Sequence, residues 1–137
     1  MIQERYTGVN GGYDVVHCKG ATSTLKGAIK SVKPANKQKK MLMSLRLQIE
    51  RLSTCKRSAD LSVRKEGELP SYNGKPKKNF WAIKKIPIRA YYWESERVHN
   101  TFFISHYIYK DFDELHDSDT KKVRNNWDRI ERGLDDC

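Results

Sequence analysis

The stretch from Asn79 to Lys110 most constrains the fold, because it is dense in aromatic and β-branched residues and contains a single proline. Residues 80–86 and 88–93 predict two strands on either side of Pro87, and residues 101–110 predict a third strand after a polar turn at 94–100. Proline cannot donate a ladder hydrogen bond, so Pro87 marks a break, a bulge or an edge. Strands this close in sequence pair most simply as antiparallel neighbours.

Two helices are predicted before this strand block. Residues 13–18 predict a short strand, and apolar residues then recur with helical spacing over 25–32 and again over 35–54. Thr22-Ser23-Thr24 is the candidate N-cap of the first helix, and Pro34 ends it because the residue before a proline disfavours the helical conformation. The short connection predicts that the two helices are antiparallel neighbours, an αα-hairpin.

The strand block is followed by one more predicted helix. It is capped by Asp117 or Ser118, has apolar residues at helical spacing over 123–130, and ends before Gly133. The sequence thus predicts an α+β fold of order β-α-α-β-β-β-α. In this fold a small, twisted antiparallel sheet packs on an N-terminal αα-hairpin and a C-terminal helix. We expect a single domain over residues 1–137, with a loose lead-in at 1–12. A polar loop excursion is expected at 57–79, and its length leaves open that part of it is functional or forms a short strand.

Several classes of protein are excluded by composition. No run approaches the roughly 18 apolar residues that a membrane span needs, and the first residues lack the apolar region of a signal peptide. The three cysteines are widely spaced and the four histidines are scattered, so neither a disulfide framework nor a metal site is expected. We therefore expect a cytoplasmic protein with no membrane partner, no metal and no cofactor.

The positive charge of the chain is concentrated in one segment. The whole chain has 27 basic and 17 acidic residues, a formal charge of +10. The window from Lys19 to Arg57 holds eleven basic residues and one acid, Glu50, so 11 − 1 = +10, while the remaining 16 basic and 16 acidic residues cancel. A segregated excess of this kind predicts a polyanion-binding face, and the alternative is a solvated helix surface. The candidate RNA-binding residues of this segment are Lys37, Lys39, Lys40 and Arg46.

The strand block carries a resemblance to a known family. The run from Phe80 to Trp93 resembles the middle strands of the RelE/ParE superfamily of bacterial toxins, particularly HigB-like members. In that family a strand reading Leu-Trp-x-Leu-Arg/Lys precedes one reading Tyr/Phe-Arg-x-x-Tyr. Residues 102–110 are similar to the next strand, an apolar run with a His and a closing Lys, and residues 119–132 are similar to the closing helix.

The resemblance implies a toxin of a toxin–antitoxin pair, encoded by a bacterium, phage or plasmid. RelE-like and HigB-like members are ribosome-dependent endoribonucleases that cut mRNA in the decoding site. The implied partners are therefore mRNA on the ribosome, ribosomal RNA and a cognate antitoxin protein. ParE-like members share the fold but inhibit DNA gyrase. A gyrase inhibitor and a non-catalytic nucleic-acid-binding accessory protein remain the alternatives to the nuclease.

RNA cleavage without a metal needs a base for the 2′-OH proton, positive charge near the phosphorane and an acid for the leaving oxygen. Arg89 matches the arginine of the family pattern, and its guanidinium can contact two phosphate oxygens. The alternative for Arg89 is an exposed arginine stacked on aromatic neighbours. Lys110 matches the basic position at the strand end, although Asp111 follows it where many relatives have a second basic residue; its alternative is an ordinary exposed lysine.

His106 is the candidate for proton transfer near neutral pH. Its alternative is a half-buried structural histidine, because it shares a strand with apolar neighbours. Lys84 and Lys85 could add phosphate contacts, but alternation allows only one of them on the face of Arg89. Parity favours Lys85 unless Pro87 resets it. Aromatic faces bind unpaired bases, so the further candidates are Tyr91, Trp93, Tyr107 and Tyr109 for stacking, and Arg124 and His116 near the last helix.

Overall fold

The computed structural model describes residues 2–8, 12–54, 63–71, 74–110 and 116–133. Three residues on which the charge and site predictions rely, Lys56, Arg57 and Asp111, lie outside these ranges. The described residues form six strands, three α-helices and one 3-10 helix. The elements are β1 Arg5–Tyr6, β2 Asp14–His17, α1 Ala21–Lys30, η1 Ala35–Lys37, α2 Gln38–Ser53, β3 Val63–Glu68, β4 Asn79–Lys85, β5 Ile88–Glu94, β6 Thr101–Tyr109 and α3 Asp117–Glu131.

All six strands belong to one mixed sheet of order β1-β2-β6-β5-β4-β3. The antiparallel pairing predicted for the strand block is confirmed, since β4 pairs with β5 and β5 with β6 in that sense. The prediction of a wholly antiparallel sheet was wrong, because β2 pairs with β6 in parallel. Parallel neighbours need a long crossover connection, and here the αα-hairpin and the β3–β5 strands supply it.

Two edge strands, β1 and β3, are additions to the predicted element order, although a short strand within 57–79 had been left open. β1 lies in the expected lead-in, and β3 lies in the expected loop excursion. β1 has only two residues, and β3 reads Val-Arg-Lys-Glu-Gly-Glu with a register shift between Lys65 and Gly67. Short, charged or bulged edge strands are common because they discourage pairing with other chains. Their sequences therefore lack the apolar alternation by which inner strands are recognised.

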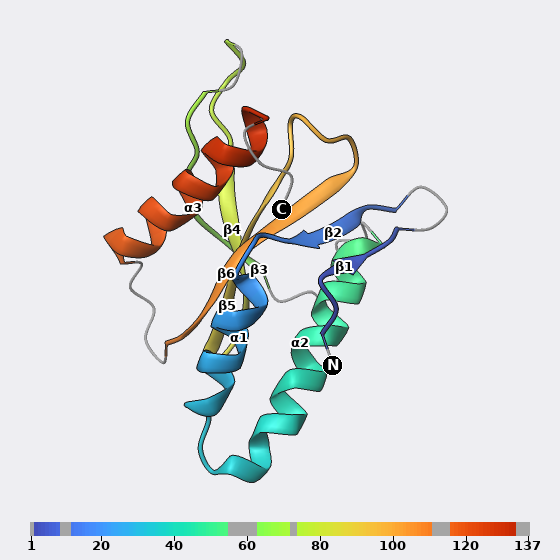
Figure 1. Ribbon diagram of the computed structural model, residues 1–137, viewed down its shortest axis with the longest axis vertical. Helices are drawn as coiled ribbons and strands as arrows, with labels where there is room; N and C mark the ends of the chain where they lie inside the picture. The colour runs from blue at the N-terminus through green and yellow to red at the C-terminus, as the bar shows by residue number, and fades with distance from the viewer. Residues whose placement is uncertain (1, 9–11, 55–62, 72–73, 111–115, 134–137) are drawn as a thin grey trace.

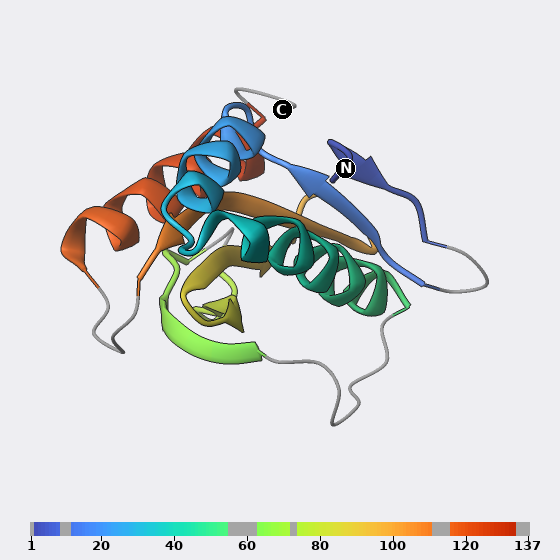
Figure 2. The same ribbon diagram turned by 90° about the horizontal axis from the view of Figure 1, so that it is seen from below.

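Helices cover both faces of the sheet. Figure 1 shows α1 and α2 side by side as an antiparallel hairpin, and Figure 2 shows the twisted sheet curling around α2. Buried residues of this hairpin, including Leu25, Leu45 and Ile49, join one core with β2, β4, β5 and β6. Val123, Trp127 and Ile130 of α3 join a second core on the opposite face. No helix among the described residues is long and apolar enough to cross a membrane.

The ends of the helices differ in part from the prediction. α1 begins at Ala21 after an N-cap Gly20 with φ 86°, a left-handed conformation that favours glycine. The predicted cap Thr22-Ser23-Thr24 instead lies in the first turn. There the Thr24 hydroxyl donates to the Ala21 carbonyl at 2.5 Å and accepts from the Tyr107 amide at 2.9 Å, which joins α1 to β6. His116 is the N-cap of α3, and Gly133 follows that helix with φ 76°, as predicted.

Candidate functional site

The predicted cations of the αα-hairpin are solvent-exposed. Because the apolar stripes of α1 and α2 face the sheet, the lysines between them point outward. Glu50 is the one acid between Lys19 and Thr54, and its carboxylate accepts from Arg46 Nε at 2.9 Å. We define the basic hairpin surface as the exposed side chains Lys26, Lys30, Lys33, Lys37, Lys39, Lys40 and Arg46.

The predicted phosphate clamp, Arg89, is buried on the opposite face of the sheet, toward α3. Its side chain is 1% exposed, and its Nη1 lies 3.7 Å from Oε1 of Glu66, which is 4% exposed. Glu66 sits at the irregularity of β3 between Lys65 and Gly67. An arginine whose charge already faces a buried carboxylate is not an open phosphate site in this conformation.

The hairpin turn between β4 and β5 decides which lysine accompanies Arg89. Lys85 pairs with Ile88 across a two-residue turn, so Lys84 pairs with Arg89. Directly paired residues lie on the same face, which places Lys84 with Arg89 and Lys85 on the other face. The prediction that Lys85 shares the face of Arg89 was wrong, because Pro87 lies in the turn itself, where the chain reverses.

His106 is buried and belongs to a chain of hydrogen bonds. A bulge between β5 and β6 leaves Ser105 beside it, with Ser105 Oγ 2.8 Å from His106 Nδ1. His106 Nε2 lies 3.0 Å from Oδ1 of Asp119, in the first turn of α3. Asn126 Nδ2 donates to Ser105 Oγ at 2.8 Å. Each group is satisfied when Asn126 donates to Ser105, Ser105 to His106 and His106 to Asp119, so the carboxylate orients the imidazole.

Tyr91, whose ring centroid lies 5.1 Å from that of His106, completes this cluster. Burial, followed by the charge of Asp119, raises the pKa of Tyr91 to about 12, so its phenol stays protonated. Lys110 is buried at the end of β6, where its backbone amide donates to the Pro87 carbonyl at 2.5 Å. We define the buried polar cluster as Glu66, Arg89, Tyr91, Ser105, His106 and Asp119.

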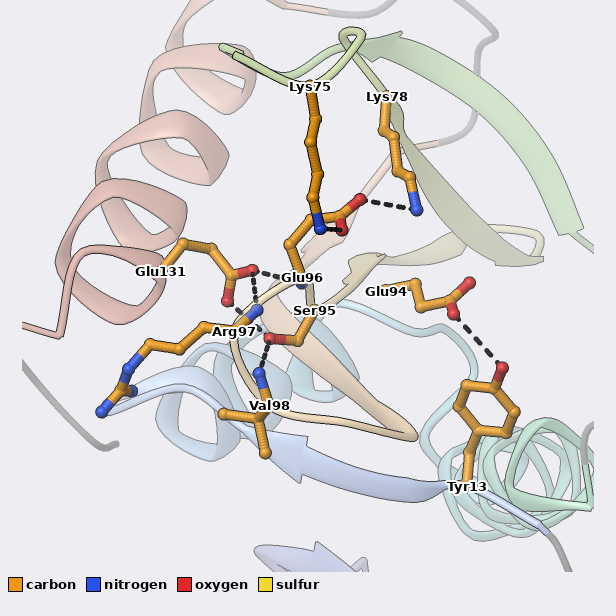
Figure 3. A network of polar contacts seen from close by, with 9 residues as sticks. All are labelled: Tyr13, Lys75, Lys78, Glu94, Ser95, Glu96, Arg97, Val98 and Glu131. Atoms are coloured by element: carbon orange, nitrogen blue, oxygen red, sulfur yellow. Dashed lines mark hydrogen bonds and ion pairs between the residues drawn. The ribbon is translucent and has the colours of Figure 1, made fainter. Parts of the chain in front are cut away.

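The other end of α3 is anchored to the β5–β6 loop (Figure 3). The buried carboxylate of Glu131 accepts from the Ser95 hydroxyl at 2.7 Å and from the backbone amides of Glu96 and Arg97. Lys78 Nζ lies 2.6 Å from the Glu96 carboxylate, and this hydrogen bond lowers the pKa of Glu96. Both ends of α3 are therefore held on the sheet by carboxylates, Asp119 at its start and Glu131 at its end.

The aromatic candidates for base stacking differ in exposure. Tyr91 and Trp93 are fully buried in the core beneath α3, which corrects the expectation that they stack on bases. Tyr107 is also buried, and its hydroxyl lies 2.6 Å from His17 Nε2. Tyr109 is 42% exposed. Of the remaining candidates, Lys84 and Lys85 are half-buried, His116 is exposed, and Arg124 is exposed with its Nε donating to the Glu68 carbonyl at 3.0 Å.

The structure thus brings Arg89 and His106 to one face but covers them, and it places the basic hairpin surface on the other side of the sheet. Sequence reasoning missed their acidic partners, Glu66 and Asp119. No local pattern marks these residues, because the partnership arises from a bulge and from the packing of α3. Within the described ranges, no group of three or more His, Cys, Asp or Glu could hold a metal ion.

No protein-family model, curated protein or solved structure matches this chain. Its function is therefore inferred from its own residues and their geometry.

Proposed function

We propose that this chain is the toxin of a bacterial toxin–antitoxin pair, a RelE/HigB-like, ribosome-dependent mRNA endoribonuclease that docks on RNA through the basic hairpin surface. The observation that carries the proposal is that surface: exposed cations on two adjacent helices, with their one acid paired internally to Arg46. Cations that neutralise phosphates release condensed counterions, which supplies most of the affinity for a polyanion. Ribosomal RNA is a polyanion large enough to contact cations on both helices of the hairpin.

The order of elements supports the family assignment within this proposal. The described chain contains β-α-α-β-β-β-α, with the edge strands β1 and β3 added. The groups that metal-free cleavage requires are also close together. Arg89 pairs in register with Ile108, and His106 pairs with Tyr91, so both project from one face of neighbouring strands. Arg89 would stabilise the phosphorane, and His106 would take the 2′-OH proton and return a proton to the leaving 5′-oxygen.

Cleavage by these groups requires a rearrangement, since Glu66 and Asp119 cover them. A phosphate is an oxyanion like a carboxylate and can replace it as the partner of an arginine or of a histidine N–H. In the proposed active state, docking on the ribosome displaces these two carboxylates and admits the mRNA backbone. Asp119→Asn keeps the shape of the side chain while removing its charge, so it is expected to increase cleavage.

The burial of the cluster also favours a second candidate function. Arg89 and His106 are each 1% exposed, so in the described conformation neither side chain is accessible to an RNA substrate. A non-catalytic nucleic-acid-binding accessory protein would use the basic hairpin surface alone. A ParE-like gyrase inhibitor would likewise keep the fold without cleaving RNA.

Induction in bacteria followed by mapping of transcript 5′ ends tests these functions. Codon-phased cuts in translated messages, together with growth arrest, support the endoribonuclease. An SOS response without cuts indicates a gyrase inhibitor, and continued growth without cuts indicates an accessory protein. Lys39→Gln/Lys40→Gln is expected to abolish the arrest, whereas the matched pair Lys121→Gln/Lys122→Gln, exposed on α3, leaves it intact.

A further inference from the structure

An apolar pair interrupts the basic hairpin surface. Met43 is 63% exposed and Leu47 is 47% exposed, although both belong to a helix whose other side is buried in the core. Residues at i and i+4 are neighbours on a helix surface, so the two side chains form one patch one turn long. We call these two residues the α2 apolar pair.

Cations flank this patch on the same helix. Lys39 and Lys40 lie one turn before Met43, and Arg46 lies three residues after it, all exposed. A phosphate backbone interacts with the cations but gains little from methionine and leucine side chains. An apolar patch framed by cations instead complements a helix with an apolar stripe and acidic flanks, which binds by burying its anchors while its carboxylates meet the cations.

We propose that α2 binds an acidic amphipathic helix of a partner protein, centred on Met43 and Leu47. The partner's apolar residues cover the α2 apolar pair, and its carboxylates pair with Lys39 and Lys40, since Arg46 already pairs with Glu50. The flexible thioether of Met43 adapts to the shape of the anchor that covers it. Recognition of this partner as the antitoxin rests on the proposed function, and its binding would then exclude RNA from the same surface.

A synthetic peptide pair tests the proposal on the full chain. The probe is a helical peptide of about 20 residues with leucines at i, i+3, i+4 and i+7 and glutamates on its flanks. The control peptide has the same composition but a scrambled order, so its leucines share no face. Fluorescence anisotropy is expected to show the amphipathic peptide binding at least about tenfold more tightly than the scrambled peptide.

Variants then separate apolar from ionic recognition. Met43→Ser/Leu47→Ser is expected to weaken the amphipathic peptide about tenfold and to change binding of a single-stranded RNA oligonucleotide by less than about twofold. Lys39→Gln/Lys40→Gln is expected to weaken binding of both the amphipathic peptide and the RNA oligonucleotide. Ile86→Ser, which replaces another exposed apolar side chain away from α2, leaves peptide binding unchanged.

Equal affinities for the two peptides, or an unchanged affinity after Met43→Ser/Leu47→Ser, would overturn the proposal and leave the surface as a binding site for polyanions alone. Circular dichroism verifies that the variants are folded, as expected for exposed positions. If the unmodified chain did not bind the RNA oligonucleotide, RNA docking would be refuted and helix binding would not. The proposed function and the proposed partner helix can therefore fail separately.

Discussion

The two helical layers of this protein use positive charge in opposite ways. In the α1–α2 layer the lysines point into solvent with almost no acids nearby, whereas beneath α3 the charge of Arg89 is buried and faces the carboxylate of Glu66. The first arrangement leaves charge available to a partner, and the second satisfies charge internally. The contrast shows that residue type alone does not identify a functional cation, because burial and partners decide what its charge can do.

Removing Arg89 should have the largest effect. Arg89→Met leaves Glu66 as an uncompensated buried charge, so the free energy of unfolding should fall by about 3–5 kcal/mol in chemical denaturation. The double variant Arg89→Met/Glu66→Leu removes both charges and is expected to recover most of that loss. Lys40→Met, at an exposed position, serves as the control and should change stability by less than about 0.5 kcal/mol. An unchanged free energy of unfolding in Arg89→Met would show that Arg89 and Glu66 do not stabilise the fold as a pair.

Glu131 should have the next largest effect, since it fixes the end of α3. Glu131→Ala leaves the Ser95 hydroxyl and the amides of Glu96 and Arg97 without their acceptor, at an expected cost of about 1–3 kcal/mol in unfolding free energy. Glu131→Gln keeps one acceptor oxygen and should lose less. The adjacent Arg132→Ala removes only an exposed ion pair with Asp128 and should change stability by less than about 1 kcal/mol. Equal losses for Arg132→Ala and Glu131→Ala would contradict the proposed anchor.

His17, beneath the α1–α2 layer, gives a pH-dependent prediction. Burial lowers the pKa of His17 from its usual 6.5, and its Nε2 faces the Tyr107 hydroxyl, whose own pKa burial raises. Below pH 6.5 the unfolded chain takes up a proton at His17 that the folded chain does not, so stability falls as pH decreases until the folded pKa is reached. The slope attributable to this residue cannot exceed about 1.4 kcal/mol per pH unit.

Urea denaturation of wild type and His17→Gln between pH 7.5 and 5 measures this contribution. The variant should lose the part of the pH dependence that His17 supplies. Parallel profiles for the two proteins would mean that His17 accepts a proton as readily in the folded chain as in the unfolded one.

The sequence predicted the elements that have strong local patterns. The aromatic run of β4 to β6, the apolar stripes of α1 and α2, and the glycine after α3 each mark their structure within a few residues. β1 was missed and β3 was left only as an open alternative, because pairing with a neighbour, not their own composition, makes them strands. The parity of Lys84 and Lys85 depended on the turn at Ile86-Pro87. For the candidate site, exposure of the hairpin lysines followed from helical periodicity, whereas the pairing of Arg89 with Glu66 depends on contacts distant in sequence.

Replacing Lys39 and Lys40 should have the smallest effect on stability and a clear effect on RNA binding. Lys39→Gln/Lys40→Gln should change the unfolding free energy by less than about 0.5 kcal/mol, because both side chains are exposed. If both lysines neutralise phosphates, the slope of log affinity against log salt for single-stranded RNA should become shallower by about 1.4, that is 0.7 for each lost contact. Filter binding over a series of salt concentrations measures this slope. Lys121→Gln/Lys122→Gln removes the same charge from the α3 layer, so equal changes in slope would mean that RNA responds to net charge and that the two layers do not differ in function.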